Sequence, residues 1–207
     1  MPKMESFERF SDEYDEWFER NVDIYEAELE AIRRLMPSAG SDGLEVGVGS
    51  GRFAARLGVQ FGVEPSSNMA LKARERGVRV LSGVAEKLPF PDARFDLVLM
   101  VTVICFADDV GEAFREAWRV LKPGGCILVA FIDRESDLGK LYADKGKSSK
   151  FYEDASFFST GEVLGHLVEA GFTDDKIGQT LIPGETGETV LDGYGVGAFI
   201  VIRCIKL

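Results

Sequence analysis

The chain has 207 residues, of which 45% are hydrophobic, so it is long enough to bury the core of one globular domain. Its 24 basic and 35 acidic side chains give a formal net charge of −11, which argues against a nucleic acid partner because a polyanion needs a basic surface. No stretch approaches the ~18 consecutive apolar residues of a membrane span, and the first residues do not resemble a secretion signal. The three cysteines lack metal-site spacing, and we expect reduced thiols in a cytoplasmic protein.

Residues 4–36 contain no glycine and have the pattern of helices. Aromatic side chains recur three and four positions apart, as on one helix face, at Phe7, Phe10, Tyr14, Trp17 and Phe18. We expect a second helix from Val22 to Met36, ended by Pro37. Together, residues 1–36 would form a helical cap.

From residue 43 to residue 132, short apolar runs alternate with helical patterns, as in parallel α/β folds. We expect strands near residues 43–48, 60–64, 79–83, 95–101 and 125–132. We expect helices near residues 51–58, 66–76 and 108–121.

The alternation breaks after Asp133. Residues 134–158 are polar with scattered aromatic side chains, and we expect a lid-like insertion there. Ser159 and Glu162 resemble a capping box for a helix that reaches Ala170. Two strands are expected to follow, near residues 173–182 and 197–205, joined by a glycine-rich connection.

The first strand leads into glycines at alternating positions, Gly47, Gly49 and Gly51. A strand, a tight turn and a helix start bring the backbone close to a nucleotide-like ligand. A dinucleotide fingerprint would place its third glycine one position later, where this chain has Arg52. Glu45 lies inside the strand, where a carboxylate suits a ligand with a sulfonium and an ammonium better than a pyrophosphate. The pattern therefore indicates a cationic nucleoside ligand.

A second acid, Glu64, ends the next apolar run. This spacing predicts that it lies at the carboxyl end of the neighbouring parallel strand, where a carboxylate can accept hydrogen bonds from both ribose hydroxyls. The alternative is a solvated residue at a strand end. The combination with the glycine turn favours the ligand role.

Four blocks in this order resemble the class I S-adenosylmethionine-dependent methyltransferases. They are the glycine turn with Glu64, the segment Gly83–Phe90, the run Phe95–Met100 and the segment Glu116–Gly125. The resemblance covers residues 43–132, with a weaker match to the C-terminus. It implies one α/β domain over residues 1–207, with a Rossmann-like seven-stranded sheet in the order 3-2-1-4-5-7-6, strand 7 antiparallel.

The resemblance also implies S-adenosylmethionine as the cofactor, with S-adenosylhomocysteine as its product. It assigns as cofactor-binding Glu45, Gly47, Gly49, Ser50, Gly51, Glu64, Pro65, Met69, Ala85, Glu86, Met100, Val101 and Tyr14. The family usually has an acid where this chain has Val84. No catalytic residue and no metal ligand is indicated.

Several side chains have two interpretations. Tyr14 and Asp15 match a family pair above the donor pocket, but Tyr14 and Trp17 are equally well explained as a buried aromatic stripe. His166, the only histidine, lies in the middle of a predicted helix, where a structural role is favoured over that of a general base. Asp96 is expected to hydrogen bond at the sheet, and Arg52 to form a structural ion pair.

The function expected is in-line methyl transfer to a small molecule, which needs mainly positioning and exclusion of water. The acceptor pocket would lie between residues 4–36 and 134–158, whose aromatic and acidic composition suits a molecule with a ring and an amine. A non-catalytic binder of the same nucleoside is an alternative. An NAD-dependent oxidoreductase is disfavoured by Glu45 and by the glycine spacing.

Overall fold

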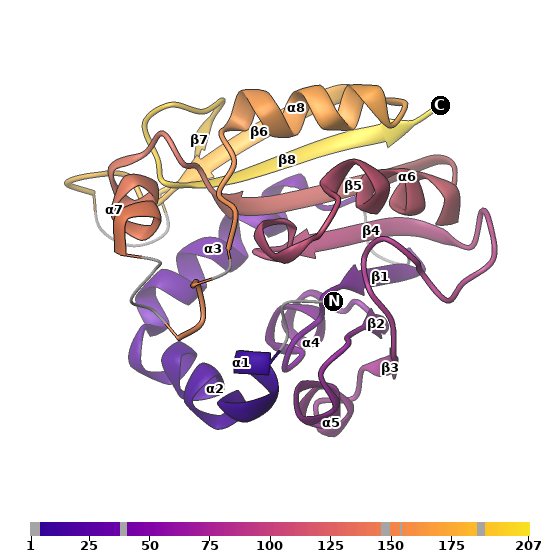
Figure 1. Ribbon diagram of the computed structural model, residues 1–207. Helices are drawn as coiled ribbons and strands as arrows, with labels where there is room; N and C mark the ends of the chain where they lie inside the picture. The colour runs from indigo at the N-terminus through magenta and orange to yellow at the C-terminus, as the bar shows by residue number, and fades with distance from the viewer. Residues whose placement is uncertain (1–4, 38–40, 146–149, 154, 186–188) are drawn as a thin grey trace.

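The computed structural model describes residues 5–37, 41–145, 150–153, 155–185 and 189–207. In this part of the chain, eight strands form one sheet in the order β3-β2-β1-β4-β5-β8-β6-β7 (Figure 1). The strands are β1 (Gly43–Val46), β2 (Phe61–Val63), β3 (Arg79–Leu81), β4 (Phe95–Val101), β5 (Leu121–Ile132), β6 (Phe172–Thr180), β7 (Leu191–Asp192) and β8 (Phe199–Lys206). Strands β1 to β5 are parallel, and β8 runs antiparallel to both β5 and β6.

The predicted strand order is confirmed, with β8 as the expected antiparallel seventh strand. The predicted number of seven strands was wrong by one, because the two-residue strand β7 adds to the outer edge of β6. A strand of two residues is too short to show the apolar alternation by which a sequence reveals a strand. The interpretation of the chain as a single domain stays a prediction.

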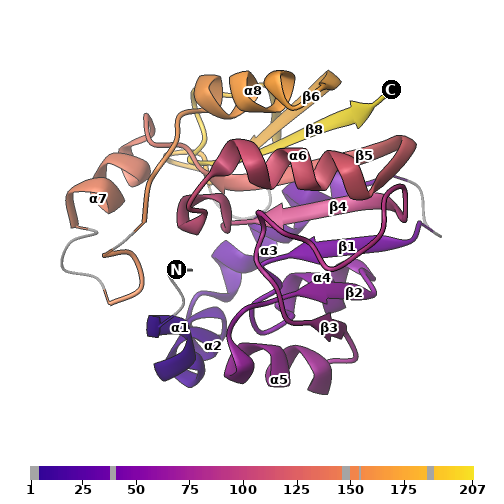
Figure 2. The ribbon, with the colours of Figure 1, turned by 45° about the vertical axis from the view of Figure 1, so that its right-hand side comes forward.

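Helices cover both faces of the sheet (Figure 2). The alternation of side chains along β4 shows the two layers: Val98 and Met100 pack toward α6 and α8, whereas Leu97 and Leu99 pack toward α3, α4 and α5. The helices are α3 (Val22–Leu35), α4 (Arg52–Leu57), α5 (Ser67–Glu75), α6 (Val110–Val120) and α8 (Thr160–Glu169). The predicted capping box of Ser159 and Glu162 is present at the start of α8.

The cap has one more helix than its aromatic stripe indicated. It forms α1 (Glu5–Arg9) and α2 (Ser11–Arg20), separated at Phe10, before α3. The insertion after β5 also contains a helix, α7 (Asp137–Lys145), which its polar composition did not indicate. Within the described residues no helix has the length and apolar character needed to cross a membrane.

The three cysteines are small core residues. Cys126 and Cys204 lie on the paired strands β5 and β8, but Cys204 is opposite Ile127, so the two side chains point to opposite faces. Cys105 is also buried, and none of the three cysteines forms a disulfide.

Candidate active site

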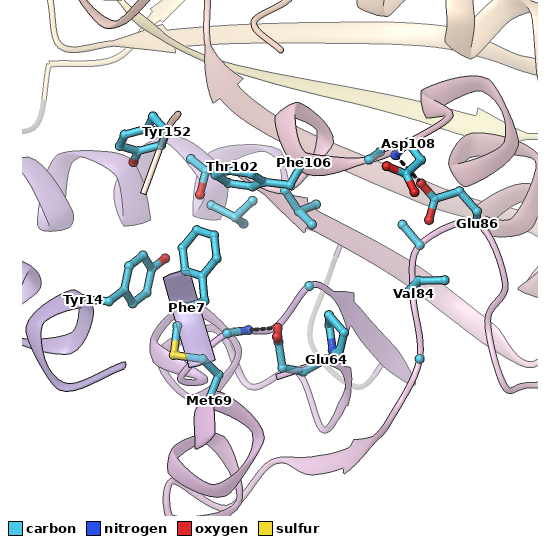
Figure 3. Close-up of a pocket in the computed structure, with 18 residues that line it drawn as sticks. Phe7, Tyr14, Glu64, Met69, Val84, Glu86, Thr102, Phe106, Asp108 and Tyr152 are labelled. Carbon is cyan, nitrogen blue, oxygen red and sulfur yellow. Dashed lines mark hydrogen bonds between the residues drawn. The ribbon is translucent and has the colours of Figure 1, made fainter. Parts of the chain in front are cut away.

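A pocket opens where the carboxyl ends of β1, β2 and β4 meet (Figure 3). It holds about 950 Å³ of space, part of which is open to solvent. Ligand sites in open α/β sheets lie at this edge, outside the carboxyl ends of the strands. Its lining consists of Phe7, Tyr14, Gly47, Gly49, Glu64, Pro65, Met69, Gly83, Val84, Ala85, Glu86, Val101, Thr102, Val103, Phe106, Ala107, Asp108 and Tyr152.

The glycine turn forms the floor of the pocket, and all three glycines have positive φ. A Cβ on Gly47 would lie 2.2 Å from Val103 Cγ2, and a Cβ on Gly51 would lie 2.8 Å from the Cα of Ala73. These two glycines allow the turn to pack against its neighbours. At Gly49 (φ +53°) the nearest atoms are side-chain carbons of Met69 and Tyr14, at 3.6 and 3.9 Å. Gly49 therefore leaves open the space into which a side chain would extend.

Glu64 stands at the end of β2 with its carboxylate held from two sides. One oxygen accepts a hydrogen bond from Gly49 N and the other from Ser66 N, both at 2.9 Å. Only 7% of the residue is exposed, and this burial raises the pKa of the carboxyl group to about 7 despite the two backbone donors. The carboxylate is thus fixed in orientation at the pocket wall, with lone pairs left to accept from a ligand.

The cap closes the pocket with aromatic rings. Phe7 of α1 and Tyr14 of α2 both line it, and their rings meet edge to face with centroids 5.5 Å apart. Burial raises the pKa of the Tyr14 hydroxyl, and the charge of Glu64 raises it further. Trp17 does not line the pocket and packs on Phe18, so it follows the structural interpretation.

Asp15 joins the cap to the glycine turn. Its carboxylate accepts hydrogen bonds from Ser50 Oγ at 2.7 Å, from Arg52 at 2.8 and 3.0 Å and from Arg76 at 2.6 Å. These donors hold the pKa of Asp15 well below its usual range, although burial opposes them. Arg52 also pairs with Glu19, which confirms the predicted structural ion pair.

The opposite wall comes from the segment after β3. Val84 and Lys87 pair in an isolated antiparallel β-bridge. The tight turn that it closes presents Val84, Ala85 and Glu86 to the pocket. The Glu86 carboxylate accepts hydrogen bonds from the backbone N–H groups of Asp108 and Asp109, at 2.7 and 3.3 Å. It therefore also fixes the start of α6.

A second hollow adjoins the first and shares Thr102 and Tyr152 with it. It holds about 350 Å³, again partly open to solvent. The remaining lining is mostly aromatic or aliphatic: Ile104, Cys105, Phe131, Ile132, Tyr142, Phe157 and Phe158. Thr102 directly follows β4 and has φ +49°, an unusual conformation for a residue other than glycine, where the chain leaves the strand between the two hollows.

The structure brings most of the predicted site residues into the lining of the first pocket, but Glu45, Ser50, Gly51 and Met100 do not line it. Met100 is fully buried beneath α6, because side chains alternate along β4. Ser50 hydrogen bonds to Asp15, and Gly51 packs on α5. Glu45 is 2% exposed and lies below the turn; one of its oxygens has no hydrogen-bond partner.

The Glu45 carboxylate contacts α4, the helix that follows the glycine turn. Burial raises its pKa well above the usual value, while a hydrogen bond from the backbone N–H of Ala54, in α4, opposes that shift. Glu45 does not line the pocket, and its direct contact with the cofactor stays a prediction.

The remaining predictions concern residues away from the pocket. His166 lies on α8 beside Glu169 and does not line either hollow, in accord with a structural role. Asp96 accepts hydrogen bonds from Asp42 N at 3.0 Å and from Lys122 Nζ at 2.9 Å, at the amino end of β4. The predicted hydrogen bonding at the sheet is confirmed.

Known proteins share both the fold and the sequence. A family model described as "Methyltransferase domain" matches residues 44–129. A solved structure from Thermotoga maritima, described as a "SAM-dependent methyltransferase, possible histamine N-methyltransferase", is 48% identical, covers 98% of each chain and has a TM-score of 0.93. An uncharacterized protein of Methanocaldococcus jannaschii is 44% identical over 99% of this chain and 100% of its own length. This chain belongs to the class I S-adenosylmethionine-dependent methyltransferases.

Another relative is longer. An uncharacterized protein of Mycobacterium tuberculosis is 37% identical over 83% of this chain, and this chain spans 61% of that protein's length.

The cofactor of this family is S-adenosylmethionine, and the pocket fits it. Glu64 is presented at the end of β2, and Gly49 leaves room for a ligand beside the turn. The described residues that line the pocket include no lysine, arginine or histidine, which suits a ligand that carries a sulfonium and an ammonium.

Phe7, Val103 and Asp108 are among the lining residues that the sequence analysis did not assign to the site. Phe7 was recognised only as part of the aromatic stripe, and Val103 and Asp108 were not singled out. All three lie near chain segments that were recognised, but their approach to the pocket depends on how α1 and the connection after β4 fold back over it.

Proposed function

We propose that this protein transfers the methyl group of S-adenosylmethionine to a small-molecule acceptor. The observation that carries the proposal is the second hollow, which adjoins the cofactor pocket at the end of β4 and is enclosed by aromatic side chains. A methyl group at the shared boundary of Thr102 and Tyr152 would face a confined, largely apolar space. Such a space suits a small ring better than a polymer chain.

Each part of the site has a task in this proposal. Glu64 binds the ribose hydroxyls of the cofactor, the glycine turn accommodates its amino-acid portion, and Val84 and Ala85 pack against its adenine. Phe7, Tyr14 and Tyr152 exclude water. S-adenosylmethionine supplies a methyl group on a positively charged sulfur, so the protein's part is to align the acceptor and keep the site dry.

The surroundings of the site support this acceptor class. The absence of basic side chains from the described lining of both hollows is unfavourable for nucleic acid or any other polyanion. The Thermotoga maritima protein is described as a possible histamine N-methyltransferase, and histamine is a small ring-bearing amine. We also propose a cytoplasmic location, because three buried cysteines without a disulfide are typical of a reducing compartment.

Calorimetric titration of the protein with S-adenosylmethionine, S-adenosylhomocysteine and NAD is the first test. We expect the first two to bind and NAD not to bind. A screen of small acceptors, read as formation of S-adenosylhomocysteine, then tests turnover. Cofactor binding without turnover on any small molecule would favour a non-catalytic binder, and tight NAD binding would contradict the proposal.

A further inference from the structure

Two residues line both hollows, and each of them carries a hydroxyl group. In the described lining these are Thr102, directly after β4, and Tyr152, from the insertion after β5. They stand where the cofactor pocket opens into the second hollow. Figure 3 shows their hydroxyl oxygens pointing into the space between the cap and the end of β4, into which the Tyr14 hydroxyl also points.

The protein itself does not use these two hydroxyl groups. Among the described residues, Thr102 Oγ1 and Tyr152 Oη form no hydrogen bond, and both residues bond through backbone atoms instead. Thr102 N donates to Ala130 O at 2.8 Å, Cys105 Sγ donates to Thr102 O at 3.3 Å, and Ala155 N donates to Tyr152 O at 3.1 Å. Each hydroxyl group therefore keeps its proton and its lone pairs available to a ligand.

Aromatic packing fixes the position of the Tyr152 hydroxyl group. The Tyr152 ring is nearly parallel to those of Phe106 and Tyr142, with centroids 6.0 and 5.5 Å away. Phe157 packs on both tyrosines. A ring packed against three others has little freedom to move, so its hydroxyl group is in place before a ligand arrives. The rings of Tyr142, Tyr152 and Phe157 form an aromatic slot on the side of the second hollow.

The second hollow is uncharged. Its described lining contains no carboxylate, lysine, arginine or histidine. Burial raises the pKa of the Tyr142 and Tyr152 phenols, so both stay protonated near neutral pH and neither takes a proton from an acceptor. A charged group in this space would lose its hydration without gaining a counter-charge. The hollow therefore favours an acceptor that is uncharged when it binds and needs no base before it attacks the methyl group.

An uncharged amine on a flat ring meets these conditions. Its ring fits the aromatic slot, and its two N–H groups can donate to Thr102 Oγ1 and Tyr152 Oη. The nitrogen lone pair is then left free to face the cofactor. The N–C bond forms as the C–S bond breaks, the electron pair of that bond stays on sulfur, and the methylated nitrogen loses its proton to solvent afterwards.

We propose that the hydroxyl groups of Thr102 and Tyr152 bind the accepting nitrogen of an uncharged ring amine and so determine the specificity of the second hollow. This inference rests on the proposed function, because it takes the second hollow to hold the methyl acceptor. It excludes acceptors that place a carboxylate, a phosphate or an ammonium group inside the hollow.

The test uses the full chain saturated with S-adenosylhomocysteine, titrated with aniline by calorimetry near neutral pH. Aniline is uncharged under these conditions, and toluene has the same shape without the N–H groups. Benzylamine, which is protonated, and benzoate are charged probes of similar size. In the parent protein we expect aniline to bind more tightly than any of the other three.

Two variants each remove one hydroxyl group. Tyr152→Phe keeps the ring of the stack, and Thr102→Val keeps a branched side chain. In each variant we expect the affinity for aniline to fall about two- to tenfold, as for the loss of one hydrogen bond between uncharged groups. The affinities for toluene and S-adenosylhomocysteine should not change. Thr102→Ser keeps the hydroxyl group and should bind aniline more tightly than Thr102→Val does.

Tyr194→Phe is the control variant, since Tyr194 is 50% exposed and lines neither hollow. It should bind aniline like the parent. Circular dichroism checks the folding of every variant, and Thr102→Gly, which suits the positive φ, replaces the valine variant if that does not fold.

Three results would overturn the inference: aniline that binds the parent no better than toluene, a charged probe that binds best, or aniline affinity unchanged in either folded variant. Each of them, with S-adenosylhomocysteine still bound, leaves the proposed function standing. Failure of S-adenosylhomocysteine itself to bind the parent would overturn both.

Discussion

Asp15 accepts two hydrogen bonds from Arg52, one from Nε at 2.8 Å and one from Nη2 at 3.0 Å. This pair joins α2 of the cap to the residue that follows the glycine turn. Only 14% of the Asp15 side chain and 15% of the Arg52 side chain are exposed, so solvent screens the pair weakly. The cap supplies Phe7 and Tyr14 to the pocket, and the pair of Asp15 and Arg52 thus attaches the cap next to the glycine turn.

Replacement of Asp15 by Asn should release the cap. The variant loses the charge that Arg52 and Arg76 share, and we expect the free energy of unfolding to fall by about 1–3 kcal/mol. S-adenosylhomocysteine should bind less tightly, because Tyr14 is no longer held over the pocket. Urea unfolding and calorimetry measure the two effects.

Asp12→Asn is the matched control for Asp15→Asn. Asp12 lies on the same helix and pairs with Lys72, but 85% of its side chain is exposed. Exposed pairs contribute about 0–1 kcal/mol, so this change should leave affinity and stability nearly unaltered. A similar loss in both variants would show that the Asp15 contacts have no special role.

Removal of the Glu64 carboxylate should weaken cofactor binding. Glu64→Ala loses two charge-assisted hydrogen bonds, and we expect the affinity for S-adenosylhomocysteine to fall at least about tenfold while the fold persists. Circular dichroism and calorimetry together check this. A folded variant with the parent's affinity would contradict the ribose assignment.

The same residue predicts a dependence on pH. The pKa of Glu64, raised by burial to about 7, means that the carboxyl group is largely protonated at pH 6 and ionised at pH 8. Ribose hydroxyls donate to the ionised form, so affinity for S-adenosylhomocysteine should rise by up to about tenfold between these values. Titrations of Glu64→Gln should show a flatter profile, and an equally steep one would assign the effect to another group.

The glycine turn offers a paired test of the cofactor site. Gly49 and Gly58 both have positive φ, +53° and +72°, so a valine at either position incurs a similar backbone cost. Only at Gly49 does the new side chain enter the pocket, because the space around Gly58 is open. Gly49→Val should abolish binding of S-adenosylmethionine, and Gly58→Val should retain it. If Gly49→Val binds as the parent does, the assignment of this turn to the cofactor fails.

Glu28 should make the protein less stable as the pH rises. Burial raises its pKa from the ordinary 4.5 to about 8, so between these values the folded protein holds a proton that the unfolded chain releases. The contribution to stability is complete below pH 4.5 and is lost as the pH approaches 8. From pH 5.5 to 7.5 we expect the parent to lose about 1–2 kcal/mol more than Glu28→Gln.

Urea unfolding at several pH values measures this difference. Glu64 also has a raised pKa and adds the same trend, but it is present in both proteins and cancels in the comparison. Parallel curves for the parent and Glu28→Gln would show that Glu28 is ionised throughout.

The cap and residues 134–158 are predicted to act as a lid. Their aromatic side chains, such as Phe7 and Tyr152, line the pocket from segments outside the sheet. We expect amide hydrogen exchange in α1, α2 and α7 to slow when S-adenosylhomocysteine binds, with α8 unchanged as the internal reference. Equal protection with and without the ligand would indicate a static insertion.

The sequence predicted best what depends on local pattern. Glu64 could be identified because it ends an apolar strand at a fixed place after the glycine turn. The strand order followed from the alternation of strands and helices and from the family resemblance. The division of the cap at Phe10 could not be predicted, because one aromatic stripe continues through both helices.

Contacts between distant segments were not accessible in this way. Phe106 follows β4, and its position in the sequence does not reveal that its ring stacks on Tyr152, which comes from the insertion after β5. Glu45 is a second example. Its place beside the glycine turn suggested contact with the cofactor, but side chains alternate along β1, and its carboxylate lies beneath the turn, near the backbone of α4.

The acidic character of the pocket affects how the protein distinguishes its substrate from its product. S-adenosylmethionine carries one positive charge more than S-adenosylhomocysteine, because its sulfur is a sulfonium. A protein with a net charge of −11, and with no basic side chain in the described lining, attracts the charged donor over a distance and exerts no such pull on the neutral product. The donor should therefore arrive faster at low ionic strength than at high ionic strength, and the spent cofactor should leave at a rate that salt barely alters. The same charge distribution that selects the ligand would then also limit inhibition by the product.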